Sequence, residues 1–134
     1  MNEPIIFVVD DDESVCRSLR RLIQSVGFHV RTFISASEFL GQGCQNMYGC
    51  LLLDAKMPRM SGLELQKRLI DSGCKIPIIF MSAHEDHLST EQALRAGAIA
   101  YLQKPFEGQL LIEKINQALS ILPVGQNPAA NDNE

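Results

Sequence analysis

The sequence predicts an α/β fold in which helices cover both faces of a doubly wound, five-stranded parallel sheet. Short apolar runs alternate five times with amphipathic stretches, which is the pattern of consecutive βα units. Three of the apolar runs are almost wholly hydrophobic, as strands buried on both faces are. With 134 residues and 46% hydrophobic composition, the chain can bury one core and is too short for two ordinary domains.

The first strands and helices follow one another at regular intervals. Apolar residues at helical spacing from Val15 to Val26 indicate the first helix, and Gly27 ends it. Ser35 and Glu38 match a capping box, which opens a short second helix. The expected strands of the whole sheet are residues 5–9, 29–33, 50–53, 78–81 and 100–103.

Three more helices are expected in the second half of the chain. The third covers residues 62–71. Ser89 and Gln92 match a second capping box, so the fourth helix is expected to begin there and to end at Gly97. Apolar residues at helical spacing between Leu111 and Leu122 line the inner face of the fifth.

Residues 1–122 are expected to form this single domain, and residues 123–134 a disordered tail or linker stub with turn formers and little apolar content. No apolar run near the start is long enough for a signal peptide or a membrane span, so a cytoplasmic location is expected. A net charge of −4 argues against direct nucleic-acid binding by this chain. Arg17, Arg20 and Arg21 are expected to be a solvated helix face.

The four cysteines show no spacing that is typical of a metal site. They contain no C-x-x-C pair, and no two are separated by a short metal-ligand interval. Buried or idle thiols are therefore expected at Cys16, Cys44, Cys50 and Cys74.

Polar residues follow four of the five expected strands where each strand ends. These residues are Asp10 and Asp11, Asp54, Ser82 and Lys104. Because open parallel sheets bind ligands at the carboxyl ends of their strands, we expect these side chains to meet. Three carboxylates brought together repel one another unless a cation neutralises them. Oxygen ligands without histidine or cysteine favour Mg²⁺ as that cation.

Asp54 is central to the chemistry that these residues allow. A carboxylate can be the nucleophile of phosphoryl transfer when a metal and a lysine offset the charge of the incoming group. Lys104 would pair with Asp54 or with a phosphoryl oxygen, and Ser82 would donate a hydrogen bond to another. Taken singly, Ser82 is an ordinary turn residue and Lys104 a solvated charge, and Asp12 is expected to cap the first helix rather than to bind metal. Their occurrence together favours phosphoryl transfer.

These residues resemble the receiver domains of two-component response regulators, over residues 5–122. The family pattern of an apolar strand ending in two acids is met by Val8-Val9-Asp10-Asp11, and the phosphoacceptor context by Leu52-Leu53-Asp54-Ala-Lys-Met-Pro58 followed by Ser61-Gly62. Ser82-Ala83 and Lys104-Pro105-Phe106 complete the set. Each motif alone is unspecific, whereas the ordered combination is specific. Gly-Phe-His-Val after the first helix and Lys-Pro-Phe-Glu near the end look most like the FixJ-like branch of the CheY-like superfamily.

The resemblance implies a flavodoxin-like sheet with strand order 2-1-3-4-5 and a set of metal ligands. Asp11 and Asp54 would bind Mg²⁺ directly, Asp10 through water, and the backbone carbonyl of Lys56 would supply a further ligand. The Lys104–Pro105 peptide bond is expected to be cis, which aims the lysine into the site.

The resemblance also implies a phosphorylation-controlled switch. Ser82, where threonine is commoner, and Tyr101 would be the switch pair. Tyr101 would turn from an outward to an inward rotamer, and the surface of the fourth helix, fifth strand and fifth helix would change. The chain would be mainly a signalling switch that catalyses its own phosphotransfer and autodephosphorylation. A sensor histidine kinase is the implied phosphodonor, a homodimer on phosphorylation is one outcome, and transcription would be regulated through a C-terminal DNA-binding domain outside this chain.

Two alternatives are weighed against this interpretation. A Mg²⁺-dependent phosphohydrolase of the haloacid-dehalogenase type would use the D-x-D spacing of Asp10 and Asp12, but Asp54 would then be idle. His84 and His87 have the spacing of a second metal site, but without further ligands nearby a solvated loop is favoured. Whether the chain acts alone or with an output domain stays open at this point.

Overall fold

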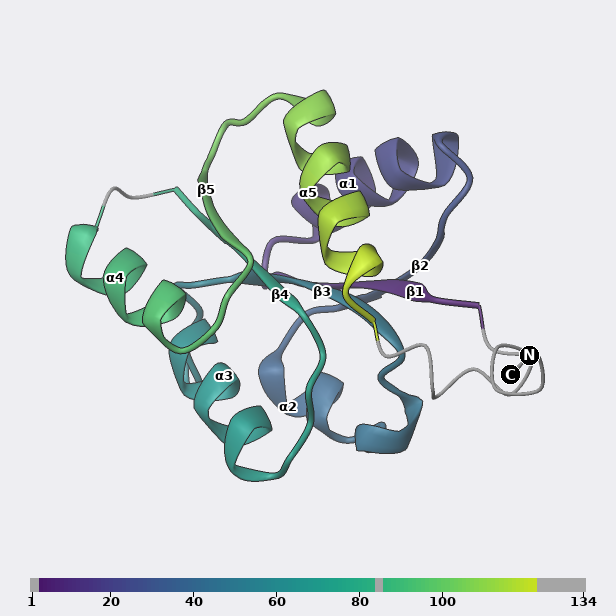
Figure 1. Cartoon of the computed structure of the whole chain (residues 1–134). Coiled ribbons are helices and arrows are strands. Elements are labelled where there is room, and N and C mark those ends of the chain that lie inside the picture. The colour runs from purple at the N-terminus through teal and green to yellow at the C-terminus, as the bar shows by residue number, and fades with distance from the viewer. Residues whose placement is uncertain (1–2, 84–85, 123–134) are drawn as a thin grey trace.

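The computed structural model describes residues 3–83 and 86–122, which form a five-stranded sheet with helices on both faces (Figure 1). All strand pairings are parallel, and the strand order is β2-β1-β3-β4-β5. The predicted fold class and the order implied by the resemblance are both confirmed. The strands are β1 (Ile5–Val9), β2 (His29–Phe33), β3 (Gly49–Asp54), β4 (Ile78–Ser82) and β5 (Ala100–Gln103).

The helices alternate with the strands as predicted. They are α1 (Glu13–Ser25), α2 (Ala36–Leu40), α3 (Gly62–Asp71), α4 (His87–Arg95) and α5 (Gly108–Ser120), with a short 3-10 turn η1 (Cys44–Asn46) before β3. In the described part of the chain, no helix has the length and hydrophobicity needed to cross a membrane. The predicted tail at residues 123–134 lies outside the described residues.

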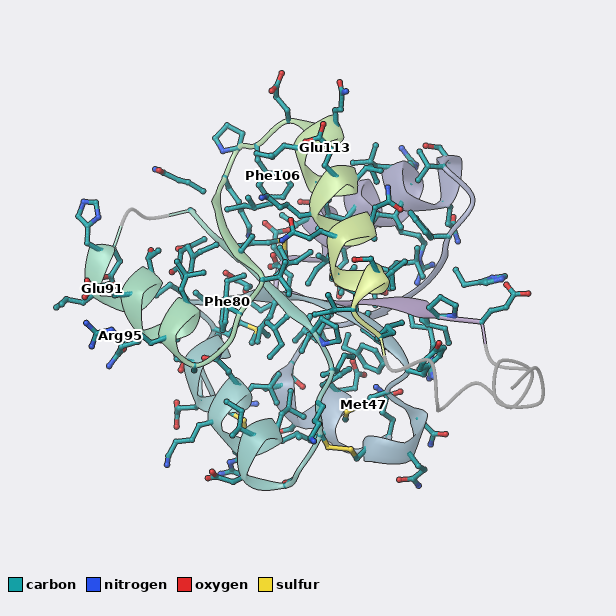
Figure 2. The ribbon with its side chains drawn as sticks, viewed as in Figure 1. Met47, Phe80, Glu91, Arg95, Phe106 and Glu113 are labelled. Carbon is teal, nitrogen blue, oxygen red and sulfur yellow. A yellow bond between two sulfur atoms is a disulfide. The ribbon has the colours of Figure 1, made fainter. Side chains whose placement is uncertain are left out.

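The three central strands are buried because helices cover both faces of the sheet. Leu51 and Leu53 of β3 belong to the core beneath α2, α3 and α4, whereas Leu52 between them belongs to the core beneath α1 and α5. Phe80 of β4 lies in the first of these cores, near the centre of the molecule (Figure 2). Side chains can therefore reach solvent from the central strands only at the strand ends, where Asp54 lies.

Polar side chains fix the starts of the first three helices. Asp12 caps α1 by accepting a hydrogen bond from the Ser14 backbone N–H at 2.9 Å, as predicted. Ser35 caps α2 and accepts from the Glu38 N–H, but the Glu38 carboxylate accepts from the Ile34 N–H instead of closing the predicted box on Ser35. Helix α3 begins at a full capping box of Ser61 and Glu64, which the sequence analysis missed.

The predicted start of the fourth helix is wrong. Helix α4 begins at His87, and Asp86 is its N-cap: the Asp86 carboxylate accepts a hydrogen bond from the Ser89 backbone N–H at 3.2 Å. Ser89, the predicted cap, lies within the helix and is buried. Aspartate and serine are equally good N-cap residues, so local sequence could not decide between them.

The prediction of four idle thiols is wrong for two of the cysteines. Cys44 in η1 and Cys74 after α3 form a disulfide, with Cα atoms 5.7 Å apart (Figure 2). The bond joins two connections that the fold brings together although they are 30 residues apart in the chain. Cys16 and Cys50 are free and buried, as predicted, and burial raises the pKa of the Cys50 thiol to about 12.

Candidate functional site

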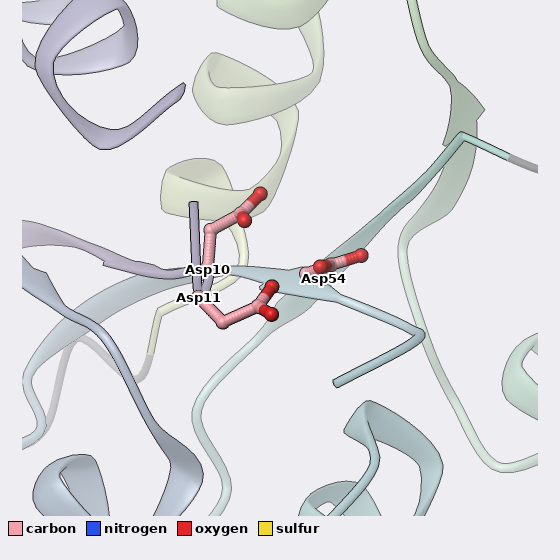
Figure 3. Close-up of side chains that lie close together, drawn as sticks. All are labelled: Asp10, Asp11 and Asp54. Atoms are coloured by element: carbon pink, nitrogen blue, oxygen red, sulfur yellow. The ribbon is translucent and has the colours of Figure 1, made fainter. Parts of the chain in front are cut away.

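Three aspartates meet at the carboxyl ends of β1 and β3 (Figure 3). Asp10 and Asp11 follow β1, Asp54 is the last residue of β3, and one carboxylate oxygen of each lies within 4.8 Å of the others. Val9 pairs with Leu53 across the sheet, so the parallel register brings the two acidic strand ends side by side. Asp10 and Asp54 are buried, whereas Asp11 is exposed. The predicted acidic cluster is therefore present.

Lys104 brings one positive charge to this cluster. Its Nζ lies 2.7 Å from Asp10 Oδ2 and 3.9 Å from Asp54 Oδ1. The backbone N–H of Lys104 donates a hydrogen bond to the Ser82 carbonyl oxygen at 2.7 Å, which holds the lysine backbone in place. The Lys104–Pro105 peptide bond is cis, as predicted. The ammonium thus contacts both buried carboxylates from the side of β5.

The surroundings of Asp54 remain net negative even though Lys104 is nearby. Burial, followed by the nearby charge of Asp10, raises the pKa of the Asp54 carboxyl to about 6, and Lys104 and the Lys56 backbone N–H offset only part of that rise. A second cation beside the carboxylates would remove the remaining repulsion. Electrostatics therefore favours cation binding at this cluster.

The oxygen atoms of the cluster suit a hard divalent ion. Asp10 already uses both oxygens, because Oδ1 accepts from the Asp12 backbone N–H at 2.9 Å and Oδ2 accepts from Lys104. Among the described residues, the Asp11 side chain has no hydrogen-bond partner, so it could bind an ion directly, whereas Asp10 would do so through water. The donor set fits Mg²⁺, which keeps several waters and takes few carboxylates.

Ser82 and Tyr101 lie where the sequence placed them, on β4 and β5. Ser82 ends β4 and is fully buried, one residue beyond Met81, the partner of Asp54 in the sheet. The Tyr101 ring stacks on Phe80 with centroids 5.6 Å apart, and its hydroxyl is shielded from solvent without a hydrogen-bond partner among the described residues. Phe80 thus offers the Tyr101 ring an apolar surface.

The connection from β3 to α3 is held close to the site by tight backbone geometry. The Gly62 N–H donates to the Ala55 carbonyl, and a Cβ atom added at Gly62 would lie 2.5 Å from the Asp54 carbonyl oxygen. Arg59 in the same connection has a φ of 71°, in the left-handed region. Only glycine permits this close approach of α3 to the backbone of the candidate nucleophile.

Asp86 is a site residue that the sequence analysis missed. Its Oδ2 lies 3.1 Å from Lys56 Nζ, so the N-cap of α4 is joined to the connection that follows Asp54. The D-x-x-S pattern of Asp86 and Ser89 is an N-cap signal, but in the sequence it competes with the capping-box match of Ser89 and Gln92. His87 is the exposed first residue of α4, and His84 lies outside the described residues.

Comparison with known proteins agrees with this geometry. Residues 6–116 match the family model described as response regulator receiver domain. The chain belongs to this family of two-component signalling domains. Its five-stranded sheet is the receiver fold, and the comparisons support this function and not the phosphohydrolase alternative.

Several curated relatives and solved structures are similar to this receiver domain. It is 44% identical over 121 residues to the response regulator protein TmoT of Ectopseudomonas mendocina, covering 90% of this chain and 55% of the relative. It is 37% identical over 118 residues to the transcriptional regulatory protein FixJ of Rhizobium meliloti (strain 1021), covering 88% and 58%. The crystal structure of FixJ-N matches with a TM-score of 0.85 at 36% identity, over 92% of this chain and 98% of that one.

Several of the relatives are longer than this chain. The structure of the response regulator StyR matches with a TM-score of 0.86 at 45% identity, over 98% of this chain but only 66% of that one. The chain spans about half the length of the curated relatives that it matches. The resemblance to the FixJ-like branch is confirmed.

Proposed function

We propose that this receiver domain accepts a phosphoryl group on Asp54 from a sensor histidine kinase. The observation that supports this proposal best is the environment of Asp54. Its buried carboxylate lies beside the carboxylates of Asp10 and Asp11, and its Oδ1 lies 3.9 Å from Lys104 Nζ. Its Oδ1 accepts from the Lys56 backbone N–H, and Oδ2 has no hydrogen bond from the described residues. Oδ2 is therefore the oxygen that attacks phosphorus, and the new O–P bond forms as the P–N bond to the kinase histidine breaks and its imidazole leaves.

The neighbouring residues prepare Asp54 for this attack. Asp11, Asp54 and the Lys56 carbonyl would hold Mg²⁺, with Asp10 bound through water, and the ion when bound offsets the charge of the transferring group. Lys104 draws one phosphoryl oxygen toward β5, and the Ser82 hydroxyl donates to another. Asp10 keeps the lysine in place through the 2.7 Å ion pair. The same residues later orient the water that removes the phosphoryl group, so the domain catalyses both its phosphorylation and its autodephosphorylation.

Phosphorylation is proposed to change the surface formed by α4, β5 and α5. The Ser82 hydroxyl moves toward the new phosphoryl oxygens, and Tyr101 on the neighbouring strand repacks against the space that it leaves. A second copy of the chain, or an output domain such as the one that lengthens its relatives, would bind the changed surface. In a FixJ-like regulator that output is control of transcription.

The central test is chemical labelling of Asp54. Acetyl phosphate with Mg²⁺ should add one hydroxylamine-sensitive phosphoryl group per chain, and Asp54→Asn or a chelator should remove the label. Asp71→Asn, which changes an exposed aspartate on α3, is the matched control and should label normally. Full labelling of the Asp54→Asn protein would show that another residue is the acceptor.

The proposed surface change needs a separate measurement. Beryllofluoride with Mg²⁺, a stable mimic of the phosphoryl group, should alter amide exchange between residues 88 and 106 and raise the dimer fraction in analytical ultracentrifugation. Unchanged exchange together with an unchanged monomer fraction would rule out the switch in this chain, although phosphorylation itself could still occur.

A further inference from the structure

The ion pair between Lys56 and Asp86 joins two connections that both border the phosphorylation site. Lys56 belongs to the connection from β3 to α3, and Asp86 is the residue before α4, 30 positions later. The Lys56 Nζ lies 3.1 Å from Asp86 Oδ2, and the Lys56 backbone N–H lies 3.3 Å from Asp54 Oδ1. One residue therefore contacts the candidate phosphoacceptor through its backbone and the start of α4 through its side chain.

Asp86 uses its carboxylate for two tasks at once. Its Oδ1 accepts from the Ser89 N–H and caps α4, while its Oδ2 accepts from the Ser89 hydroxyl at 2.7 Å and from Lys56. The hydrogen bonds from Ser89, and then the one from Lys56, hold the pKa of the Asp86 carboxyl well below its usual range. Asp86 Oδ2 is thus an acceptor that competes with other anions for the Lys56 ammonium.

The ion pair between Lys67 and Asp71 is an ordinary surface pair and serves for comparison. Lys67 Nζ lies 3.8 Å from Asp71 Oδ2 on α3, and the two side chains are 79% and 66% exposed. They are one turn apart on the same helix, so their pairing joins no separate elements. The Lys56 and Asp86 side chains are less exposed, at 49% and 29%, and join the β3–α3 connection to the N-cap of a different helix, α4.

We propose that Asp86 is a positioning residue that holds Lys56 at rest and releases it to the phosphoryl group on Asp54. The inference rests on the proposed function. A phosphoryl group adds negative charge and acceptor oxygens beside the Lys56 backbone, and these oxygens compete with Asp86 for the single positive charge of Lys56. Phosphorylation therefore weakens the link between the β3–α3 connection and the N-cap of α4. Through this exchange of partners, α4 responds to the charge at Asp54 independently of Ser82 and Tyr101.

A double-mutant cycle tests the exchange of partners. Asp86→Asn removes the charge but keeps a good N-cap for α4, and Lys56→Met keeps most of the side-chain stem without the ammonium. The probe is beryllofluoride with Mg²⁺, and its dissociation constant is measured by calorimetry. Because Asp86 no longer competes for Lys56, the Asp86→Asn protein should bind roughly two- to fivefold more tightly, which is the range expected for an exposed ion pair.

The second arm of the cycle separates release of Lys56 from a general charge effect. Lys56→Met should weaken binding, and in that background Asp86→Asn should change the dissociation constant no further. Asp71→Asn is the control for loss of an aspartate partner and should bind like the unmodified protein. Equal gains from Asp86→Asn with and without Lys56, or no gain at all, would overturn the inference. If the unmodified protein itself failed to bind the probe, the proposed function would fail first, so the two failures are distinguishable.

Discussion

Replacement of Asp54 by asparagine should stabilise the metal-free protein, although it removes the proposed phosphoacceptor. The carboxylate is buried against Asp10, and its pKa is raised from the ordinary 3.8 to about 6. Each tenfold change in an acid constant corresponds to about 1.4 kcal/mol, so the ionised carboxylate costs the folded state about 3 kcal/mol at neutral pH. Asparagine has nearly the same shape and no charge, so the predicted gain in unfolding free energy is about 1–3 kcal/mol at pH 7.5.

The pH dependence of this gain follows from the direction of the pKa shift. A carboxyl group whose pKa is higher in the folded than in the unfolded state favours folding while it is protonated. Its contribution to stability is therefore largest below pH 3.8, declines as the pH rises toward about 6, and is lost above that value. The advantage of the Asp54→Asn protein should accordingly shrink to less than about 1 kcal/mol at pH 4.

Urea unfolding followed by circular dichroism at pH 4 and pH 7.5, with a chelator present, measures both values. Groups that do not interact with Asp54 titrate equally in both proteins, so their contributions cancel in the difference. Asp71→Asn corrects for the change in net charge, because Asp71 is an exposed aspartate with an exposed lysine partner. A difference that is the same at the two pH values, or a less stable Asp54→Asn protein at pH 7.5, would refute the electrostatic argument.

Four further predictions concern the metal and the connections around the site. Mg²⁺ at ten times its dissociation constant should stabilise the unmodified protein by about 1.4 kcal/mol, and the Asp54→Asn protein by less, in thermal unfolding; equal stabilisation of both would place the ion elsewhere. Arg59→Asn should raise the unfolding free energy by about 1 kcal/mol, because asparagine tolerates the φ of 71° better, and a loss of stability would contradict this. Gly62→Ala should cost about 1–3 kcal/mol and reduce labelling, since the added Cβ would lie 2.5 Å from the Asp54 carbonyl oxygen; unchanged melting and labelling would show that α3 can move away. Asp12→Ala should lower the urea midpoint of unfolding through loss of the α1 cap, whereas Asp12→Asn should leave it nearly unchanged, and equal losses would point to the charge instead of the cap.

The sequence by itself determined the succession of elements and the residue types at the strand ends. Wholly apolar runs predict strands covered on both faces, and parallel strands place Asp10, Asp54 and Lys104 at one edge of the sheet. Local periodicity encodes both facts, so they could be predicted without coordinates. The strand order required the family resemblance, because alternation of strands and helices is compatible with several orders.

Only the tertiary structure decided which distant residues contact one another. The disulfide between Cys44 and Cys74 and the ion pair between Lys56 and Asp86 each join residues 30 positions apart, and no local pattern predicts such contacts. The tertiary structure also decided where α4 begins. Asp86 and Ser89 have similar N-cap preferences, but only Asp86 gains Lys56 as a second partner. The physical reason is the same in each case: local sequence determines what a residue can do, but the packing of helices on the sheet determines which partner lies within reach.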